Sequence, residues 1–174
     1  SSDLLKRFTN QAANYSFPVS NSLDELAKAV IRPSSSGATA WEVTFKSPNP
    51  YGASGLTPGQ IDQVTDYYWL INRKGSSPAN ASAVTLCYDS LTNPGLTIFN
   101  QLQMVYFNNP SWVGYGSVPG TGSITNALGT NGSAAPANPI TSFGVFALGG
   151  KASIVPLTIE YFSGRKSGIK NELL

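Results

Sequence analysis

The chain has 174 residues with eleven basic and nine acidic side chains and no histidine, which gives a formal net charge of +2. The lack of histidine excludes Ser-His-Asp and Cys-His catalysis and histidine-based metal sites, and the single cysteine, Cys87, excludes an internal disulfide or a thiolate cluster. The weak net charge does not predict nucleic-acid binding, and no apolar run approaches the roughly 20 residues of a membrane-spanning helix.

The first predicted elements are short. Residues 1–14 are expected to be an N-terminal lead-in segment, either a helical turn over 3–8 or a disordered stretch. Residues 22–30 fit a short helix capped by Ser22, but the following Ile31, Arg32 and Pro33 favour a strand. Both structures therefore remain open for 22–30.

The stretch from residue 15 to residue 162 is typical of strands separated by glycine and proline turns. Within 40–46, Trp41, Val43 and Phe45 alternate with polar residues, which predicts one apolar face. Residues 67–72 are apolar on both faces, which indicates a central strand. The other predicted strands are 15–19, 82–88, 97–107, 112–115, 142–148 and 153–162.

A long stretch rich in glycine, serine and threonine, 116–139, interrupts this series. We expect a surface loop there with one short strand near 123–127, although a loop of this length is uncommon in a compact domain unless it is functional. The spacing of strands and turns predicts an all-β fold, an antiparallel β-sandwich of Ig-like or jelly-roll-like type with at most one or two short helices. One domain would span 15–162, and a C-terminal tail or linker would span 163–174.

The carboxylates form no recognisable catalytic or metal-binding pattern. Nothing in the sequence places two of them across a cleft as a glycosidase pair. Asp62 and Asp66 could help to bind calcium, but the alternating oxygen ligands of an EF-type loop are absent, so turn carboxylates at the entry to a strand are the favoured interpretation. We therefore predict no catalytic residue, no metal site and no cofactor, and a protein that is not an enzyme.

The aromatic residues offer the best candidates for a ligand contact. Trp112 and Tyr115 lie beside predicted turns, where exposed rings could stack on a sugar. Such a platform needs two or three exposed rings on one face, whereas aromatic residues on strands mostly pack in cores or across strands. Packing is the favoured interpretation, and Trp112 and Tyr115 are the candidate ligand-binding residues.

Several motifs follow one another in an order that matches a known module. They are Phe17-Pro18-Val19, Trp41–Phe45, Pro48–Tyr51, Val64–Ile71, Ala81–Asp89, Ile140–Gly149 and Pro156–Phe162. Over about 15–162, this set resembles a β-rich module of large secreted and surface proteins of the Bacteroidetes, in which an "FPVG"-like opening, a "YW-I" strand, an "ITSFGPFTLG"-like strand and a "PLPIELLSF"-like strand occur in turn. Ser20 stands in place of the module's usual glycine, and Val145 in place of a common proline.

The resemblance implies a location more than an activity. Members of this group are associated with adhesion and surface layers, and many carry a terminal sorting domain for type IX secretion after the last motif. The resemblance therefore implies an extracellular protein at a bacterial cell surface. It also makes Ser90, in Asp89-Ser90-Leu91, a candidate O-glycosylation acceptor, although a plain turn at a strand end is the favoured interpretation.

Composition and strand pattern favour a structural or adhesive surface module, because charged residues make up 11% of the chain against about 25% in ordinary domains. Such a module could be a subunit of a filament or layer that assembles by sheet-edge pairing. The candidate assembly strand carries Val155, Leu157, Ile159 and Tyr161 on one face, although pairing within its own chain is the favoured interpretation. Expected partners are copies of the chain, other surface proteins and glycans, without nucleic acid and without membrane insertion.

Two other functions remain open from the sequence. A carbohydrate-binding module is the first alternative, and it depends on Trp112 and Tyr115. A capsid or projection domain of a small virus is the second, because uncharged strands rich in glycine, proline and threonine fit that class as well. The absence of a basic arm for packaging nucleic acid makes the viral alternative the weakest.

Overall fold

The computed structural model describes residues 4–20, 26–52, 54–58, 60–75, 78–88, 103–115, 132–134, 140–150, 164–167 and 170–173. These ranges consist of strands, bridges, turns, bends and irregular residues, and none of their residues is helical. The predicted all-β class is therefore confirmed. In the same ranges, no helix has the length and hydropathy needed to span a membrane.

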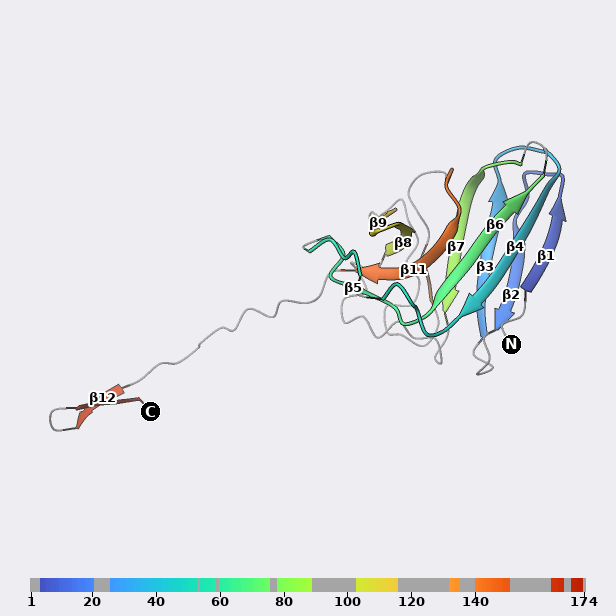
Figure 1. The fold of residues 1–174 in the computed structure, drawn as a ribbon. Helices are drawn as coiled ribbons and strands as arrows, with labels where there is room; N and C mark the ends of the chain where they lie inside the picture. The colour runs from blue at the N-terminus through green and yellow to red at the C-terminus, as the bar shows by residue number, and fades with distance from the viewer. Residues whose placement is uncertain are drawn as a thin grey trace.

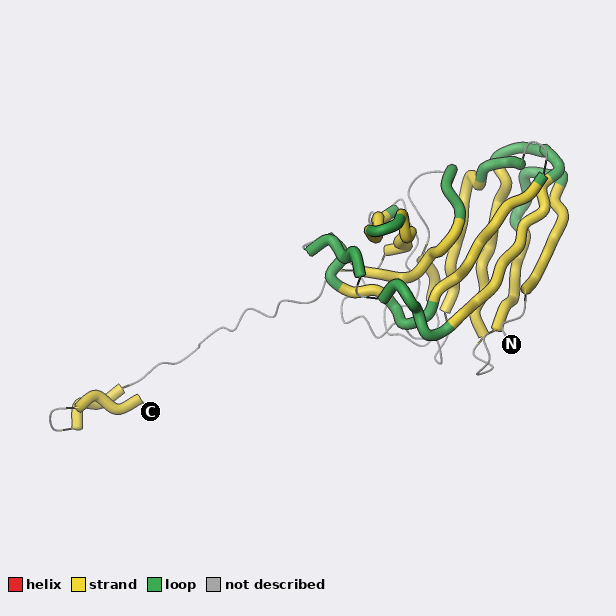
Figure 2. The backbone as a smooth tube through the Cα atoms, viewed as in Figure 1, coloured by secondary structure: helices red, strands yellow, loops and turns green. Residues whose placement is uncertain are grey.

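Two antiparallel sheets pack face to face as a β-sandwich (Figures 1 and 2). The first sheet has the order β1 (Leu4–Thr9), β4 (Thr39–Lys46), β6 (Tyr68–Lys74), β11 (Gly144–Gly150), β8 (Gln103–Asn108) and β9 (Ser111–Gly114), and β5 (Gln63–Val64) pairs with β11. The second sheet has the order β10 (Gly132–Ala134), β7 (Ala81–Tyr88), β3 (Leu26–Pro33) and β2 (Tyr15–Ser20). A separate two-stranded sheet joins β12 (Gly164–Ser167) to β13 (Lys170–Leu173).

The inner core lies between the two sheets. Trp41, Val43 and Phe45 of β4 are fully buried there, as the alternation predicts. Trp69 of β6 lies opposite Phe45, with 5.1 Å between the ring centroids, and Ile71 lies opposite Val43. The second sheet contributes further fully buried side chains, namely Phe17, Ala29, Ile31, Val84 and Leu86. Because burial of large apolar side chains is the main favourable term in folding, this core holds the two sheets together.

A second, smaller core covers the opposite face of the first sheet. Strand residues that alternate with the inner core build it, together with residues 47–66 (53 and 59 are not described), which we call the covering segment. The buried members of this outer core are Ile61, Tyr68, Val105, Trp112 and Ala147, and Tyr51, Leu56 and Val64 of the covering segment pack against them. The first sheet is thus apolar on both faces here, as 67–72 predicted.

The expectation of a lead-in over 1–14 is wrong for residues 4–9, which form β1. This strand pairs with β4 from Leu4 opposite Thr44 to Thr9 opposite Thr39. Leu5 packs against the inner core, and the hydroxyl of Thr9 accepts a hydrogen bond of 3.1 Å from Nε1 of Trp41. Contacts with a strand 30 residues away therefore order a segment that has little strand pattern of its own.

Of the helix and the strand that remained open for 22–30, the structure shows a strand in the described part, 26–30. β3 lies between β2 and β7 in the second sheet. Ala27, Ala29 and Ile31 are buried, whereas Lys28 and Arg32 are exposed. This period of two is the signature of a strand, so the helical alternative fails where the structure describes the segment.

The other predicted strands are found with small shifts in their ends. Strands at 15–19, 40–46, 67–72, 82–88, 112–115 and 142–148 correspond to β2, β4, β6, β7, β9 and β11. The predicted strand 97–107 is described from 103 onward, as β8, and those at 123–127 and 153–162 lie outside the described residues. Inside the expected loop 116–139, β10 pairs with β7, and β12 and β13 form a hairpin inside the expected tail 163–174.

Candidate functional site

The outer strands of the two sheets are the natural places to look for contacts with other molecules. An outer strand presents unpaired backbone N–H and C=O groups on one side, so natural proteins usually block it with prolines, charges, short length or a covering loop. Among the described residues, the outer strands are β1 and β9 in the first sheet and β2 and β10 in the second.

The open side of β2 is blocked by a neighbouring arginine and by a proline. Nη1 of Arg7, on β1, donates a hydrogen bond of 2.7 Å to the backbone oxygen of Ser16, and its guanidinium lies 5.7 Å from the ring centroid of Tyr15. The backbone groups of Ser16 and Pro18 point to the same side, because N–H and C=O directions alternate along a strand. Pro18 has no N–H to offer, so β2 is a poor template for a further strand.

Two other outer strands are also protected. The backbone N–H of Trp112 in β9 donates to the backbone oxygen of Gly55 at 2.9 Å, and the indole Nε1 of Trp112 donates to the oxygen of Gly52 at 3.1 Å. The covering segment therefore occupies part of that edge. β10 spans only three described residues, Gly132–Ala134, which gives little length for pairing.

Among the described residues, β1 is the outer strand that exposes two large apolar side chains. Leu4 is 58% exposed and Phe8 is 77% exposed, and Lys6 lies between them on the same face of the strand. Nζ of Lys6 is 5.2 Å from the ring centroid of Phe8, at cation–π distance. We call Leu4, Lys6 and Phe8 the β1 patch. No strand of the described residues pairs with the outer side of β1, so the patch combines an open edge with two apolar side chains that solvent reaches.

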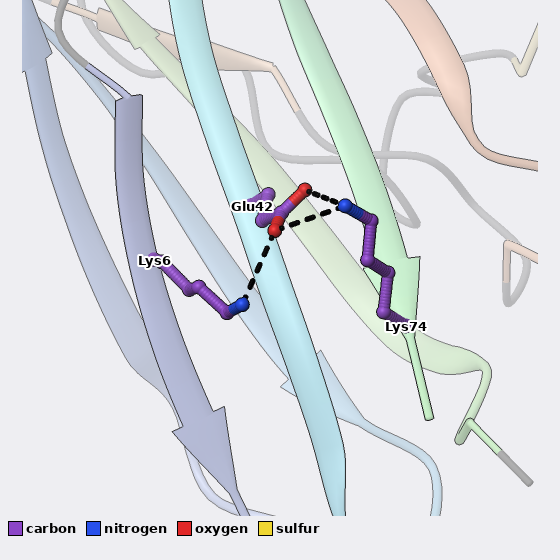
Figure 3. Close-up of polar contacts among 3 residues, drawn as sticks. All are labelled: Lys6, Glu42 and Lys74. Atoms are coloured by element: carbon purple, nitrogen blue, oxygen red, sulfur yellow. Dashed lines mark hydrogen bonds and ion pairs between the residues drawn. The ribbon is translucent and has the colours of Figure 1, made fainter. Parts of the chain in front are cut away.

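An ion cluster holds the centre of the β1 patch in place (Figure 3). Glu42 of β4 lies directly opposite Lys6, and its Oε1 is 3.4 Å from Nζ of Lys6. Nζ of Lys74, on β6, lies 3.0 Å from Oε2 of the same carboxylate. The hydrogen bond from Lys74 is the largest of the effects that lower the pKa of Glu42, and Lys6 adds to it. The carboxylate thus stays charged and fixes Lys6 beside Phe8.

A cleft lies at the opposite end of the first sheet, beside β9. It has a volume of about 500 Å³ and is lined by Thr57, Gln60, Ile61, Gln103, Ser111, Trp112, Val113 and Gly114. Nε2 of Gln103 donates a hydrogen bond of 3.1 Å to the backbone oxygen of Gln60, which ties β8 to the covering segment. The lining thus combines two carboxamides, two hydroxyls and a few apolar groups.

The two aromatic residues singled out from the sequence lie on opposite faces of the first sheet. Trp112 is 1% exposed in the outer core, and it is one of the residues that line the cleft. Tyr115 packs against the inner core near Tyr106 and Phe146, and burial raises the pKa of its hydroxyl. Positions 112 and 115 differ by an odd number, so a strand directs them to opposite sides. These two rings therefore do not form one stacking platform.

The remaining sequence candidates have different outcomes. Ser90 and the strand that carries Val155, Leu157, Ile159 and Tyr161 lie outside the described residues. Oδ1 of Asp66 accepts a hydrogen bond of 3.3 Å from the backbone N–H of Asn49, as a turn carboxylate would. Within the described ranges, no three cysteine or carboxylate side chains gather into a metal-binding group.

Sequence reasoning missed the β1 patch and the amide groups of the cleft. Leu4 and Leu5 are both apolar, so the six residues of β1 lack the alternation that marks a strand with one buried face. Gln60 and Gln103 are far apart in the sequence, and neither belongs to a motif. The odd separation of positions 112 and 115, in contrast, can be read from the sequence, and it indicates that a strand would direct the two rings to opposite faces.

Comparisons of the chain with protein-family models, with curated proteins and with solved structures give no match.

Proposed function

We propose that the chain is a non-enzymatic structural or adhesive module of an extracellular bacterial surface protein, and that its copies associate by sheet-edge pairing at β1. The observation that carries this proposal is the contrast between the outer strands. β2, β9 and β10 each have a feature that hinders pairing, whereas β1 exposes Leu4 and Phe8 beside an edge that no described strand covers. An exposed apolar edge strand is a template for another strand.

The expected strength of this contact suits an assembly better than an isolated pair. Full burial of Leu4 and Phe8 would contribute about 1.5–3 kcal/mol for each side chain. Association itself costs at least about 4 kcal/mol, so one such contact binds weakly even with backbone hydrogen bonds added. Repetition of weak contacts in a filament or layer raises the overall affinity through effective concentration.

The sequence supplies a candidate for the partner strand and for the location. Val155, Leu157, Ile159 and Tyr161 alternate along one segment, so a strand formed by it in a second copy would have an apolar face to lay beside β1. The low content of charged residues and the ordered motifs shared with Bacteroidetes surface modules support an extracellular, type IX-exported protein. Copies of the chain or other surface proteins are thus the partners we propose.

Light scattering coupled to size-exclusion chromatography, together with electron microscopy, tests the assembly. We expect the unmodified chain to form larger species as its concentration approaches about 1 mM, and the double variant Leu4→Ser/Phe8→Ser to remain monomeric there. Val113→Ser is the matched control, because Val113 is 44% exposed on β9, at the other end of the same sheet. Circular dichroism verifies that each variant is folded. A monomeric unmodified chain at this concentration, or an equal effect of the control, would contradict the proposal.

A further inference from the structure

The cleft beside β9 has the size and construction of a small-molecule site. Its volume of about 500 Å³ lies within the range of about 300–1,000 Å³ that is usual for ligand pockets. Three elements build it: the covering segment, the start of β8 at Gln103, and β9. Hydrogen bonds join these elements, since Gln103 donates to the oxygen of Gln60 and Trp112 donates to the oxygen of Gly55. The walls are therefore fixed to one another.

The chemistry of the lining selects a neutral, polar ligand. The carboxamides of Gln60 and Gln103 and the hydroxyls of Thr57 and Ser111 both donate and accept hydrogen bonds, and no lining residue is charged. An anionic ligand would call for arginine or lysine donors, and a purely apolar ligand would bury the carboxamides without partners. Hydroxyl groups of a sugar both donate and accept, so they match this set.

The carboxamide of Gln103 lies close against Gly114. A Cβ atom on Gly114 would lie only 2.4 Å from Oε1 of Gln103, so a larger residue there would push this carboxamide aside. Its hydrogen bond to Gln60 uses one of its two amide hydrogens, and a carboxamide oxygen can accept two hydrogen bonds. Val113, which is exposed, adds an apolar rim against which the C–H face of a sugar ring can pack.

We propose that this cleft binds a neutral carbohydrate chain, with Gln60 and Gln103 as the main hydrogen-bonding side chains. The site goes beyond the proposed assembly function and does not depend on it. β1 and β9 are the two ends of the first sheet, so a copy that is paired at β1 keeps its cleft accessible at the other end. Failure of one proposal therefore leaves the other standing, because each has its own variants and its own readout.

Nuclear magnetic resonance titration of the ¹⁵N-labelled full chain tests the site, with cellohexaose, xylohexaose and mannohexaose as probes. With at least one of them, we expect shifts of the side-chain amide signals of Gln60 and Gln103 and of the indole N–H signal of Trp112. Gln103→Ala should weaken this binding by up to about tenfold, as expected when one hydrogen bond to the ligand is lost. Gly114→Ala should weaken it as well, because the new methyl group displaces the Gln103 carboxamide.

Gln63→Ala is the matched control, because Gln63 is an exposed glutamine of the covering segment outside the cleft lining. This variant should bind as the unmodified chain does. The proposal is overturned if no oligosaccharide causes a shift at about 10 mM, a concentration that reveals even millimolar affinity. It is also overturned if the shifts lie outside the cleft, if Gln63→Ala weakens binding as much as Gln103→Ala, or if an extended peptide binds along β9 and the sugars do not.

Discussion

Glu42 lies on the outer face of β4 with a lysine on the strand to either side. It is only 8% exposed, so its carboxylate is partly withdrawn from water and depends on its two ammonium partners. Desolvation by itself would raise the pKa of Glu42, and the bonds from Lys74 and Lys6 more than offset this effect. The cluster also keeps Lys6 over the ring of Phe8, which links a charge pair on the sheet to the shape of the β1 patch.

Glu42→Gln should destabilise the chain at pH 7, and this difference should shrink in acid. The pKa of Glu42 is lowered in the folded state, so between the two pKa values the unfolded chain binds more protons. The contribution of the carboxylate is therefore fully present above the unfolded pKa of about 4.3 and is lost as the pH falls through the lower folded pKa. Urea unfolding of the unmodified chain and of Glu42→Gln between pH 7 and pH 2 measures this contribution to the free energy of unfolding.

The control for Glu42→Gln is Lys46→Gln, which removes a charge from the same strand. Lys46 is not one of the two lysines that bind Glu42, so its substitution should give a difference with little dependence on pH in the acid range. A destabilisation by Glu42→Gln that stays constant from pH 7 to pH 2 would show that the charge of the carboxylate does not contribute.

Among the strands, the edge of β2 owes part of its protection to Arg7, a residue of the other sheet. Arg7→Met should remove the hydrogen bond to the oxygen of Ser16 and open this edge. We expect a loss of about 1 kcal/mol in the free energy of unfolding and slightly stronger association at high concentration, because the oxygen of Ser16 becomes open to another strand while Pro18 still hinders pairing. Urea unfolding and light scattering measure the two effects. Lys28→Met, an equal loss of charge on the adjacent strand β3, should leave association unchanged; equal association of both variants would assign the effect to net charge.

The strands that the sequence predicts best are those with local patterns. Trp41, Val43 and Phe45 alternate, and β4 buries all three; Tyr68 and Trp69 are apolar in succession, and β6 has a core on each face. β1 is different, because its partner β4 lies some 30 residues away and the pairing decides its structure. Tertiary context routinely overrides such weak local preference.

The candidate sites likewise have one part that a local sequence pattern indicates and another part that only the fold brings together. The place of Trp112 beside a predicted turn indicates a position near the surface, and Trp112 does line the cleft. Its neighbours in that cleft, Gln60 and Gln103, come together only because the covering segment folds back across β8 and β9. The exposed side of β1 is likewise a property of sheet order, since it depends on β1 being an end strand. No local window of sequence contains that information.

The sandwich with its covering segment has three layers and two cores, and the first sheet belongs to both cores. Tyr68 faces the outer core and Trp69 the inner one, and the same alternation occurs at Phe146 and Ala147. The second sheet touches only the inner core, so the covering segment should detach at a lower free energy than the sandwich unfolds. Local opening of this kind is common where one layer has few buried contacts.

Gly55→Ala should detach the covering segment selectively. Gly55 has φ of +70°, and a Cβ atom there would lie 1.9 Å from the backbone oxygen of Pro110 and 2.7 Å from Cα of Ser111. Because both obstacles are backbone atoms of the β8–β9 turn, the segment must move, at a cost of about 2 kcal/mol or more. Hydrogen exchange should therefore accelerate at Trp112 and along the covering segment by about 30-fold, while amides of β2 and β3 stay protected.

Gly52→Ala is the control that separates the effect of the steric clash at Gly55 from the effect of a positive φ. Gly52 also has a positive φ, +23°, but an added Cβ would meet only the oxygen of Asn49, at an ordinary contact distance of 3.5 Å. Its substitution should cost about 1 kcal/mol, from the left-handed conformation alone. If Gly55→Ala instead accelerates exchange in β2 and β3 as much as in the covering segment, the layers unfold together. The outer core would then be an extension of the inner one, and the cleft between the segment and β9 would be as rigid as the sandwich itself.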